Sequence, residues 1–358
     1  MQSESNEDRD LETASSDQVD TDRCHLEDRR DFLASTAALG ILPLLSNAIQ
    51  AEETATATAP PDISGKKSLI GDYGSWAAGL ANDPPRLSFR LNRWSDVDTW
   101  RKAARFKTGE LIASPPIEGD QNVKLVDKFQ FDGLEMERLS WQLPYGRETQ
   151  AVLLKPKSAA GPLPAILGLH DHGGNKYFGH RKITRSSSSQ HPLVLEHQRE
   201  YYGGRAWANE IAKRGYVVLA HDTFTFASRR VLFQDMAEIP WGPCKTEGMS
   251  DDAPESPESI KTYNDWAAAH EHVMAKSLFC AGTTWPGVFL AEDQAALSVL
   301  SSRSDVDEDR IGCAGLSGGG LRTVYLGGLD PRIKCAVCVG FMSTWNDFLL
   351  YKSYTHTW

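Results

Sequence analysis

One serine in this sequence has the surroundings of a catalytic nucleophile. Ser317 stands in the pentapeptide Gly-Leu-Ser-Gly-Gly, which runs from Gly315 to Gly319. A serine hydroxyl attacks a carbonyl carbon only when it is exposed, lies beside a base, and has hydrogen-bond donors near the oxygen that becomes negative. A sharp turn from a strand into a helix exposes the side chain, and flanking glycines let the backbone segments pass closely. The spacing therefore predicts nucleophilic catalysis by Ser317.

The same chemistry requires amide donors for the developing oxyanion. We expect one donor at Gly318, because its N–H opens the helix that follows the serine. The segment His170-Asp171-His172-Gly173-Gly174 follows an apolar run, in the place where this kind of site finds its second donor. We expect that donor at Gly174, with Gly173 as the alternative.

Two histidine pairs also raise the question of a metal site. His170 and His172 have no third ligand nearby in the sequence, which falls short of a zinc pattern. His270 and His272 are two positions apart, a spacing that does not share one face of a helix. We therefore expect structural hydrogen bonds from these histidines, and neither a metal ion nor a cofactor.

The chain has six cysteines, too few and too scattered for a small disulfide scaffold. Cys335 and Cys338 form a CxxC pair within the apolar run 333–339, which we interpret as a buried strand. Side chains three positions apart on a strand point to opposite faces, so these two cannot easily pair. We expect both to serve as small buried hydrophobic residues.

Hydrophobic patterning predicts the elements that position these residues. Alternation of apolar and polar residues from 123, through 134–139 and 149–154, predicts antiparallel strands. Nearly continuous apolar runs predict strands covered on both faces, as in a parallel sheet, and lie at 164–169, 216–220, 311–316 and 333–339. Helical patterns between them, at 207–214, 289–301 and 319–329, complete βαβ units.

These patterns predict an α/β domain over residues 121–358. Within it, residues 223–276 form a stretch too long for a plain connection. We expect an insertion that lies over the site and shapes substrate access, with a solvated excursion as the alternative.

Residues 52–120 are expected to form a linker and a helical extension. The linker is rich in Thr, Ala and Pro. Trp and Leu then recur at helical spacing from 73 to 106. Trp76, Trp94 and Trp100 could form a sugar-stacking set, but aromatic residues at this spacing favour a packed core.

Residues 1–51 have the composition of a disordered region followed by an export signal. The first 28 residues are acidic and lack apolar periodicity, so they predict disorder. Arg29 and Arg30 then precede an apolar run over 32–45 and small residues with cleavage sites after Ala48 or Ala51. This arrangement resembles a twin-arginine signal peptide, although Asp28 stands where Ser or Thr is usual. The resemblance implies the Tat export machinery as a partner and a periplasmic or extracellular location.

The overall charge bears on possible partners. The formal net charge is −10 at pH 7. Nucleic-acid phosphates and anionic lipid surfaces bind clusters of Lys and Arg, so this balance argues against both partners.

The run from Trp285 to Met342 resembles a known family. It joins Val-Asp-Glu-Asp-Arg-Ile-Gly, the serine turn, and Asp-Pro-Arg-Ile-Lys in the order seen in bacterial α/β-hydrolases of the dienelactone hydrolase and acetyl xylan esterase group. The His170–Gly174 segment fits the same group. The resemblance implies an α/β-hydrolase fold, a mostly parallel sheet with helices on both faces.

The same resemblance implies ester hydrolysis through an acyl-serine intermediate, with a small-molecule or carbohydrate ester as the substrate. Ser317 is then the nucleophile, and Gly318 and Gly174 are the oxyanion donors. Two alternatives stay open: a peptidase of the same fold, and a non-catalytic envelope protein that binds a carbohydrate or a partner.

That fold places an acid and then a histidine after the serine. Downstream of Ser317 stand Asp330, which we interpret as part of a helix-end turn, Asp347, and one histidine, His356. We expect the catalytic acid and histidine beyond residue 358. The fold is then incomplete at its carboxyl end, and this chain is expected to be truncated and inactive or weakly active.

Overall fold

The computed structural model describes residues 67–80, 82–158 and 161–353. The predictions for the disordered region, the export signal, most of the linker and His356 lie outside the described residues. Within the part of the chain that is described, no helix is both long and apolar enough to cross a membrane.

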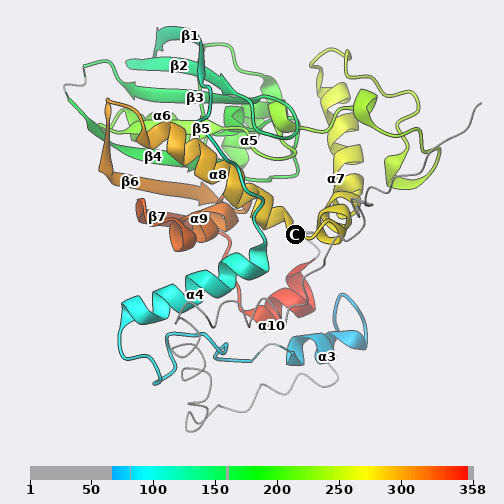
Figure 1. Cartoon of the computed structure of the whole chain (residues 1–358). Coiled ribbons are helices and arrows are strands. Elements are labelled where there is room, and N and C mark those ends of the chain that lie inside the picture. Colours follow the sequence, from blue (N-terminus) through cyan, green and yellow to red (C-terminus); the bar gives the residue numbers. More distant parts are fainter. Residues whose placement is uncertain (1–66, 81, 159–160, 354–358) are drawn as a thin grey trace, which may run out of the picture. The chain divides into compact units, whose positions relative to one another are not determined.

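The described residues form one seven-stranded mixed sheet with the order β1-β2-β3-β5-β4-β6-β7 (Figure 1). The strands up to β3 are antiparallel neighbours, β3 is antiparallel to β5, and β5, β4, β6 and β7 run parallel. The antiparallel beginning and parallel remainder predicted from patterning are both confirmed. The strands are β1 (Lys124–Phe131), β2 (Leu134–Trp141), β3 (Thr149–Pro156), β4 (Leu163–Leu169), β5 (Val217–His221), β6 (Val306–Leu316) and β7 (Ile333–Val339).

Helices precede, connect and follow the strands. Two of them begin with proline in the first turn behind a capping hydroxyl, Ser256 for α7 and Thr284 for α8. The α-helices are α3 (Tyr73–Gly79), α4 (Val97–Ile112), α5 (Pro192–Tyr202), α6 (Trp207–Ala212), α7 (Pro257–Cys280), α8 (Trp285–Ser301), α9 (Gly318–Leu329) and α10 (Trp345–Asp347). The shorter turns are η1 (His180–Lys182), η2 (Ala227–Arg229), η3 (Phe233–Asp235), η4 (Gly242–Cys244) and the π-helical η5 (Phe348–Lys352).

Helices cover the sheet on both faces, and the strands divide their side chains between them. Leu153, Leu167 and Leu219 pack against α8 and α9 in one core cluster. The alternate residue Val218 packs against α6 in the second cluster, on the other face. This three-layer arrangement, with Ser317 on the turn from β6 to α9, is the α/β-hydrolase fold.

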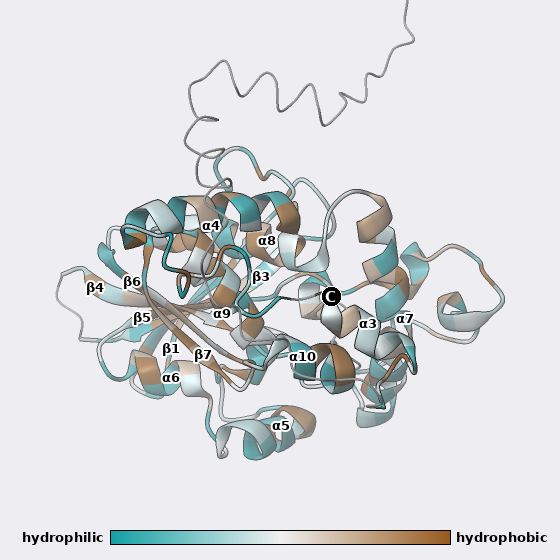
Figure 2. Ribbon diagram, turned by 90° about the horizontal axis from the view of Figure 1, so that it is seen from below, coloured by the Kyte–Doolittle hydropathy of each residue, from teal (hydrophilic) through white to brown (hydrophobic). Residues whose placement is uncertain are grey.

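The expectation that β7 is a buried strand is wrong for most of its side chains. Val337 is 50% and Val339 47% exposed, Cys335 is exposed, and Cys338 is half-buried. Figure 2 shows this apolar strand at the edge of the sheet. In the described part of the chain β7 pairs only with β6 and is covered on one face by α9. Sequence alone could not show that its other face is open.

The helical extension contains α3 and α4. Asp96 caps α4 by accepting hydrogen bonds from the N–H groups of Asp98 and Thr99. Trp94 and Trp100 are half-buried and donate their indole N–H groups to loop carbonyls, each at 2.8 Å. Trp76, by contrast, is 66% exposed, so the core prediction was wrong for that residue.

The stretch 223–276 contains three short turns, η2 to η4, and most of α7. Tyr263, Trp266 and Ala267 of α7 form a hydrophobic cluster with Phe233 and other loop residues. Through Glu271, α7 also contacts the loop after β4. The stretch therefore supplies a helix to the surroundings of Ser317.

Candidate active site

Ser317 lies on a strained turn between β6 and α9. Its backbone has φ 53° and ψ −115°, a conformation that L-residues rarely adopt. Its N–H donates to the carbonyl oxygen of Val339 at 2.8 Å, which ties the turn to the end of β7. The residue is half-buried. The predicted strand–turn–helix setting of this serine is present.

Two flanking glycines let the turn pack closely. A Cβ on Gly315 would lie 2.4 Å from the carbonyl carbon of Gly319, and a Cβ on Gly319 would lie 2.1 Å from the carbonyl oxygen of Leu169. Both contacts are with backbone atoms that cannot rotate away. Only glycine therefore fits at these positions, and α9 rests directly on the end of β4.

The amide of His172 lies beside the elbow. The position of a Cβ on Gly318 would be 3.0 Å from the backbone nitrogen of His172, which is the nearest atom to it. Gly174, predicted as the second oxyanion donor, gives its N–H to the imidazole Nδ1 of His172 at 3.0 Å. The structure thus brings Ser317, Gly318 and the backbone of His172 together, while the Gly174 amide hydrogen is directed at the imidazole.

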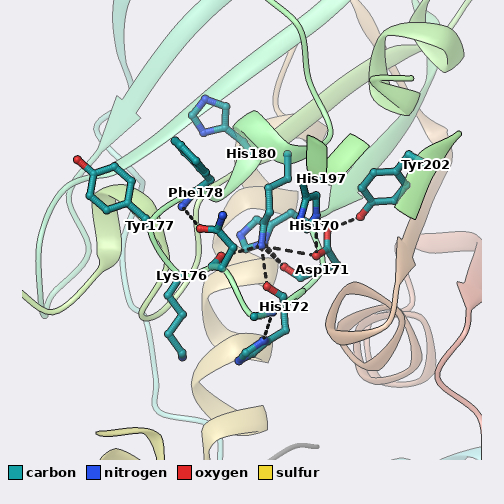
Figure 3. A network of polar contacts seen from close by, with 12 residues as sticks. His170, Asp171, His172, Lys176, Tyr177, Phe178, His180, His197 and Tyr202 are labelled. Carbon is teal, nitrogen blue, oxygen red and sulfur yellow. Dashed lines mark hydrogen bonds and ion pairs between the residues drawn. The ribbon is translucent and has the colours of Figure 1, made fainter. Parts of the chain in front are cut away.

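The loop after β4 is held by a carboxylate and an ammonium group (Figure 3). The Asp171 carboxylate accepts hydrogen bonds from Tyr202 and from His197, whose Nε2 lies 3.2 and 3.0 Å from its two oxygens. Lys182 donates to the carbonyl oxygens of Asp171, His172 and Asn175. Burial opposes ionisation of Asp171, but the Lys182 charge and the His197 hydrogen bond hold its pKa well below the usual range.

The imidazole of His172 is fixed by Glu271 of α7. Its Nε2 lies 2.5 Å from the Glu271 carboxylate, and Lys176 donates to the same carboxylate oxygen at 2.9 Å. Burial lowers the pKa of His172. Glu271 also is desolvated, yet the hydrogen bond from His172 and the Lys176 charge lower its pKa to about 2. Because both ring nitrogens of His172 are engaged, this imidazole does not take up the proton of the serine in this arrangement.

A second buried network fixes α9 beneath the serine. Arg322 donates to the Asp293 carboxylate of α8, with its Nη2 2.5 Å from one oxygen, and to the carbonyl oxygen of His170 at 3.4 Å. His221, at the end of β5, lies 3.0 Å from the same Asp293 oxygen. Despite the burial, these partners lower the pKa of Asp293. The ends of β4 and β5 are thereby joined to both helices.

The remaining histidines of the described residues form no cluster of metal ligands. His170 is buried and its Nε2 has no hydrogen-bond partner among the described residues; burial lowers its pKa well below the usual value. His270 stacks on Trp266 with ring centroids 4.8 Å apart. Over residues 67–80, 82–158 and 161–353, no group of three or more metal-ligating side chains is present.

The two described acids downstream of the serine differ in their surroundings. Asp330 follows α9 and accepts hydrogen bonds from Arg332 and Gln294, which confirms its interpretation as a helix-end residue. Asp347 lies exposed in α10. In the described part of the molecule, neither acid and no histidine is hydrogen-bonded to the Ser317 hydroxyl.

Of two cavities among the described residues, only the smaller lies beside residues of the site. The larger one, about 610 Å³, lies between residues 114–123 and the outer face of α8, and Ser317 does not line it. The second is very small and lies near Lys176, between α7 and Trp285. Ser317 is therefore identified by its turn and not by the larger of these two cavities.

Sequence patterns missed Lys182, Lys176, Asp171 and Glu271 as parts of the site. Their partners lie from 7 positions away, for Lys182 and Asn175, to 99 positions away, for His172 and Glu271. One available signal was the charge itself, since Lys176 and Lys182 follow the His170–Gly174 segment within a few residues. Such lysines are usually solvated, and burial cannot be seen in the sequence.

Comparisons with known proteins give distant similarities. No family model matches the chain. Over 218 residues, 61% of this chain, the sequence is 28% identical to a Bacillus subtilis (strain 168) protein provisionally named hydrolase YtaP, and the match covers 56% of that protein.

Similar solved structures include a Bacteroides fragilis protein provisionally named an acetyl xylan esterase, with 20% identity and a TM-score of 0.48 over 66% of this chain and 51% of that one. A glucuronoyl esterase from Solibacter usitatus gives 14% identity and a TM-score of 0.37 over 67% and 58% of the two chains. The chain thus matches between 51% and 58% of the length of each of these proteins.

Proposed function

We propose that this chain is part of a serine hydrolase that acts on carboxylic esters through an acyl-serine intermediate. The observation that carries the proposal is the conformation of Ser317, with φ 53° and ψ −115° on the turn between β6 and α9. A strained non-glycine residue at such a turn is characteristic of a nucleophile elbow. The similarity to the hydrolase YtaP agrees with this class of reaction.

In the proposed reaction the Ser317 oxygen attacks the ester carbonyl carbon, and its proton passes through a general base to the leaving alcohol. The carbonyl oxygen becomes negative and accepts hydrogen bonds from backbone amides. We assign these amides to Gly318 and His172, whose backbone atoms lie beside each other. Water then attacks the acyl-serine, which releases the carboxylic acid and restores the hydroxyl.

For the substrate we propose acetyl esters of carbohydrates. This step rests on the motif run from Trp285 to Met342 and its resemblance to acetyl xylan esterases. Three substrates separate the candidates. Acetate release from acetylated xylan indicates a carbohydrate esterase, hydrolysis of an aryl acetate alone indicates a general esterase, and hydrolysis of an acyl anilide indicates a peptidase.

The direct test is labelling with a fluorophosphonate, followed by peptide mapping of the modified serine. We expect modification at Ser317 and loss of both labelling and ester turnover in Ser317→Ala. Ser343→Ala, at an exposed serine beyond β7, serves as the control and should change neither. Labelling that persists in Ser317→Ala, or no labelling of the parent protein, would rule out the proposed nucleophile.

We also propose export by the twin-arginine route, on the basis of Arg29, Arg30 and the apolar run that follows. Replacing both arginines with lysine should leave the protein in the cytoplasm of a bacterial host. Unchanged recovery from the periplasm or medium would contradict this route.

A further inference from the structure

Lys182 is at the centre of the loop that follows β4. Its side chain is 0% exposed, and its ammonium group donates to the carbonyl oxygen of Asp171 and, at 3.1 Å each, to those of His172 and Asn175. An ammonium group has three N–H donors, so the loop carbonyls use all of them. One charge thereby holds three carbonyl groups of the loop.

One of these carbonyls belongs to the peptide group that faces the elbow. The Asp171 carbonyl and the His172 N–H are the two ends of a single peptide unit, and the His172 nitrogen lies beside Gly318. A charged donor on the carbonyl withdraws electrons from the peptide and makes its N–H a stronger donor. Lys182 thus both places and polarises this N–H.

Lys176 provides an internal comparison. Both ammonium groups lie over the ring of Phe226, at 4.6 Å for Lys176 and 4.8 Å for Lys182. Lys176, however, bonds to the side chains of Glu271 and Thr225, at 2.9 and 2.8 Å. The nearest carboxylate oxygen to Lys182 is 3.7 Å away, on Asp171. Of these two lysines, Lys182 is the one that directs its charge at the loop backbone.

We propose that Lys182 is a positioning residue for the oxyanion hole, which it serves by holding and polarising the Asp171–His172 peptide group. The inference rests on the proposed function of Ser317 and deepens it. It assigns an electrostatic role in the reaction to a buried side chain that does not touch the substrate.

The protonation state of Lys182 gives the proposal a pH signature. Burial lowers the pKa of Lys182 to about 8, and the charges of Lys176 and Arg322 add to this effect, while Asp171 and Asp222 oppose it. The buried His170 also faces this cluster. Because the lysine is cationic below its pKa, activity should fall as pH rises through about 8. Burial lowers the pKa of Lys176 to a similar value, so the two lysines must be separated by substitution.

The kinetic test compares Lys182→Met, Lys182→Arg and Lys176→Arg in ester hydrolysis from pH 6 to 10. We expect Lys182→Met to lower kcat by about 10- to 100-fold with KM nearly unchanged, since the effect arises in the transition state. Lys182→Arg should recover most of kcat and lose the decline near pH 8, whereas Lys176→Arg should keep that decline. A decline that persists in Lys182→Arg, or parental kcat in Lys182→Met, would overturn the proposal.

Lys155→Met is the matched control for loss of a paired lysine. Lys155 lies near the end of β3, away from the serine turn, and bonds to Asp305 and Glu135. Lys155→Met should lower the melting temperature while leaving kcat and the pH profile unchanged. A merely structural role for Lys182 would make the Lys182 variants behave in the same way.

A spectroscopic arm separates this inference from the proposed function. The carbonyl ¹³C shift of Asp171 and the ¹⁵N shift of His172 should titrate with a midpoint near pH 8 in the parent and stay constant in Lys182→Arg. Flat signals in the parent would refute the polarisation whatever the activity. Ester turnover that survives Ser317→Ala would refute the proposed function, and the shifts would still decide the role of Lys182.

Discussion

At the scale of single residues, the strain at Ser317 has a measurable consequence for stability. A backbone held outside the common regions costs on the order of 1–3 kcal/mol. Glycine adopts positive φ freely, so Ser317→Gly should relieve this strain although it adds disorder to the unfolded chain. We expect the free energy of unfolding of Ser317→Gly to exceed that of Ser317→Ala by about 1 kcal/mol, as measured by urea denaturation.

Ser343 supplies the matched pair for this measurement. It is exposed and is not among the described residues with positive φ. There Ser→Gly should be less stable than Ser→Ala, the reverse of the order at Ser317. The same order at both positions would contradict the account of strain at the elbow.

A second residue-scale prediction concerns Glu271. Its pKa is lowered from 4.5 to about 2 by His172 and Lys176, against the effect of burial. A carboxyl group with a depressed folded-state pKa adds stability above its unfolded pKa, and that stability is lost as pH falls toward the folded value. The parent should therefore lose up to about 3 kcal/mol in its free energy of unfolding between pH 5 and pH 2 through protonation of Glu271. Glu271→Gln should lack this loss.

Urea denaturation at intervals between pH 6 and pH 3 measures this contribution. The curves of the parent and Glu271→Gln should converge as the pH falls, because the parent loses the contribution that the variant lacks. Parallel curves for Glu271→Gln would show that its ion pair adds no pH-dependent stability.

Which site residues could be predicted depended on the range of the interaction. Ser317 and Gly318 form one local motif, and a turn of this kind is defined by neighbouring residues. Lys182 and Glu271 reach the loop after β4 across 10 and 99 positions. Their roles follow from burial and partners that only the folded chain brings together.

At the scale of elements, α9 meets the end of β4 through one glycine. A Cβ on Gly319 would lie 2.1 Å from the Leu169 carbonyl oxygen, so Gly319→Ala requires the helix to move. We expect a loss of more than about 3 kcal/mol in the free energy of unfolding. Gly328→Ala, on the same helix with open space around it, should instead add about 0.5–1 kcal/mol.

Thermal denaturation of the two alanine variants, followed by circular dichroism, tests this contrast. A melting temperature for Gly319→Ala close to that of the parent would mean that α9 can shift without cost. The elbow would then be less rigid than its contacts with β4 indicate.

Strands were more predictable than helices in this chain. The strand predictions at 164–169 and 311–316 fall within β4 and β6, because apolar runs of this length fit a covered parallel sheet. Most of helix α7, which is 24 residues long, lies in the stretch 223–276, which was predicted only as an insertion. Ser256 followed by Pro257 is a helix-start signal that was available, but the Pro-rich approach to it suggested a loop.

At the scale of the whole molecule, the fold class followed from the order of patterns, because alternating and continuous apolar runs separate antiparallel from parallel strands. The exposure of β7 did not follow. A run such as Ile-Lys-Cys-Ala-Val-Cys-Val is apolar on both faces, but burial depends on neighbours that the run does not encode. The described sheet therefore has two edges of different chemistry.

The last prediction concerns these edges. β1 carries Lys124, Asp127 and Lys128, and charges of this kind discourage pairing with another chain. β7 presents Val337 and Val339, which are 50% and 47% exposed, and only one charged side chain. An open apolar edge strand is a template for association, so we expect this 358-residue chain to self-associate through β7.

Sedimentation velocity over a range of concentrations, under reducing conditions because Cys335 is exposed, measures this association. Val337→Lys should shift the distribution toward the monomer, since a charge on the pairing edge opposes contact with a second apolar strand. Val126→Lys, at a 63% exposed valine of β1, should leave the distribution unchanged. If both substitutions had the same effect, association would follow from general surface hydrophobicity; if neither had any, the β7 edge would not be the contact.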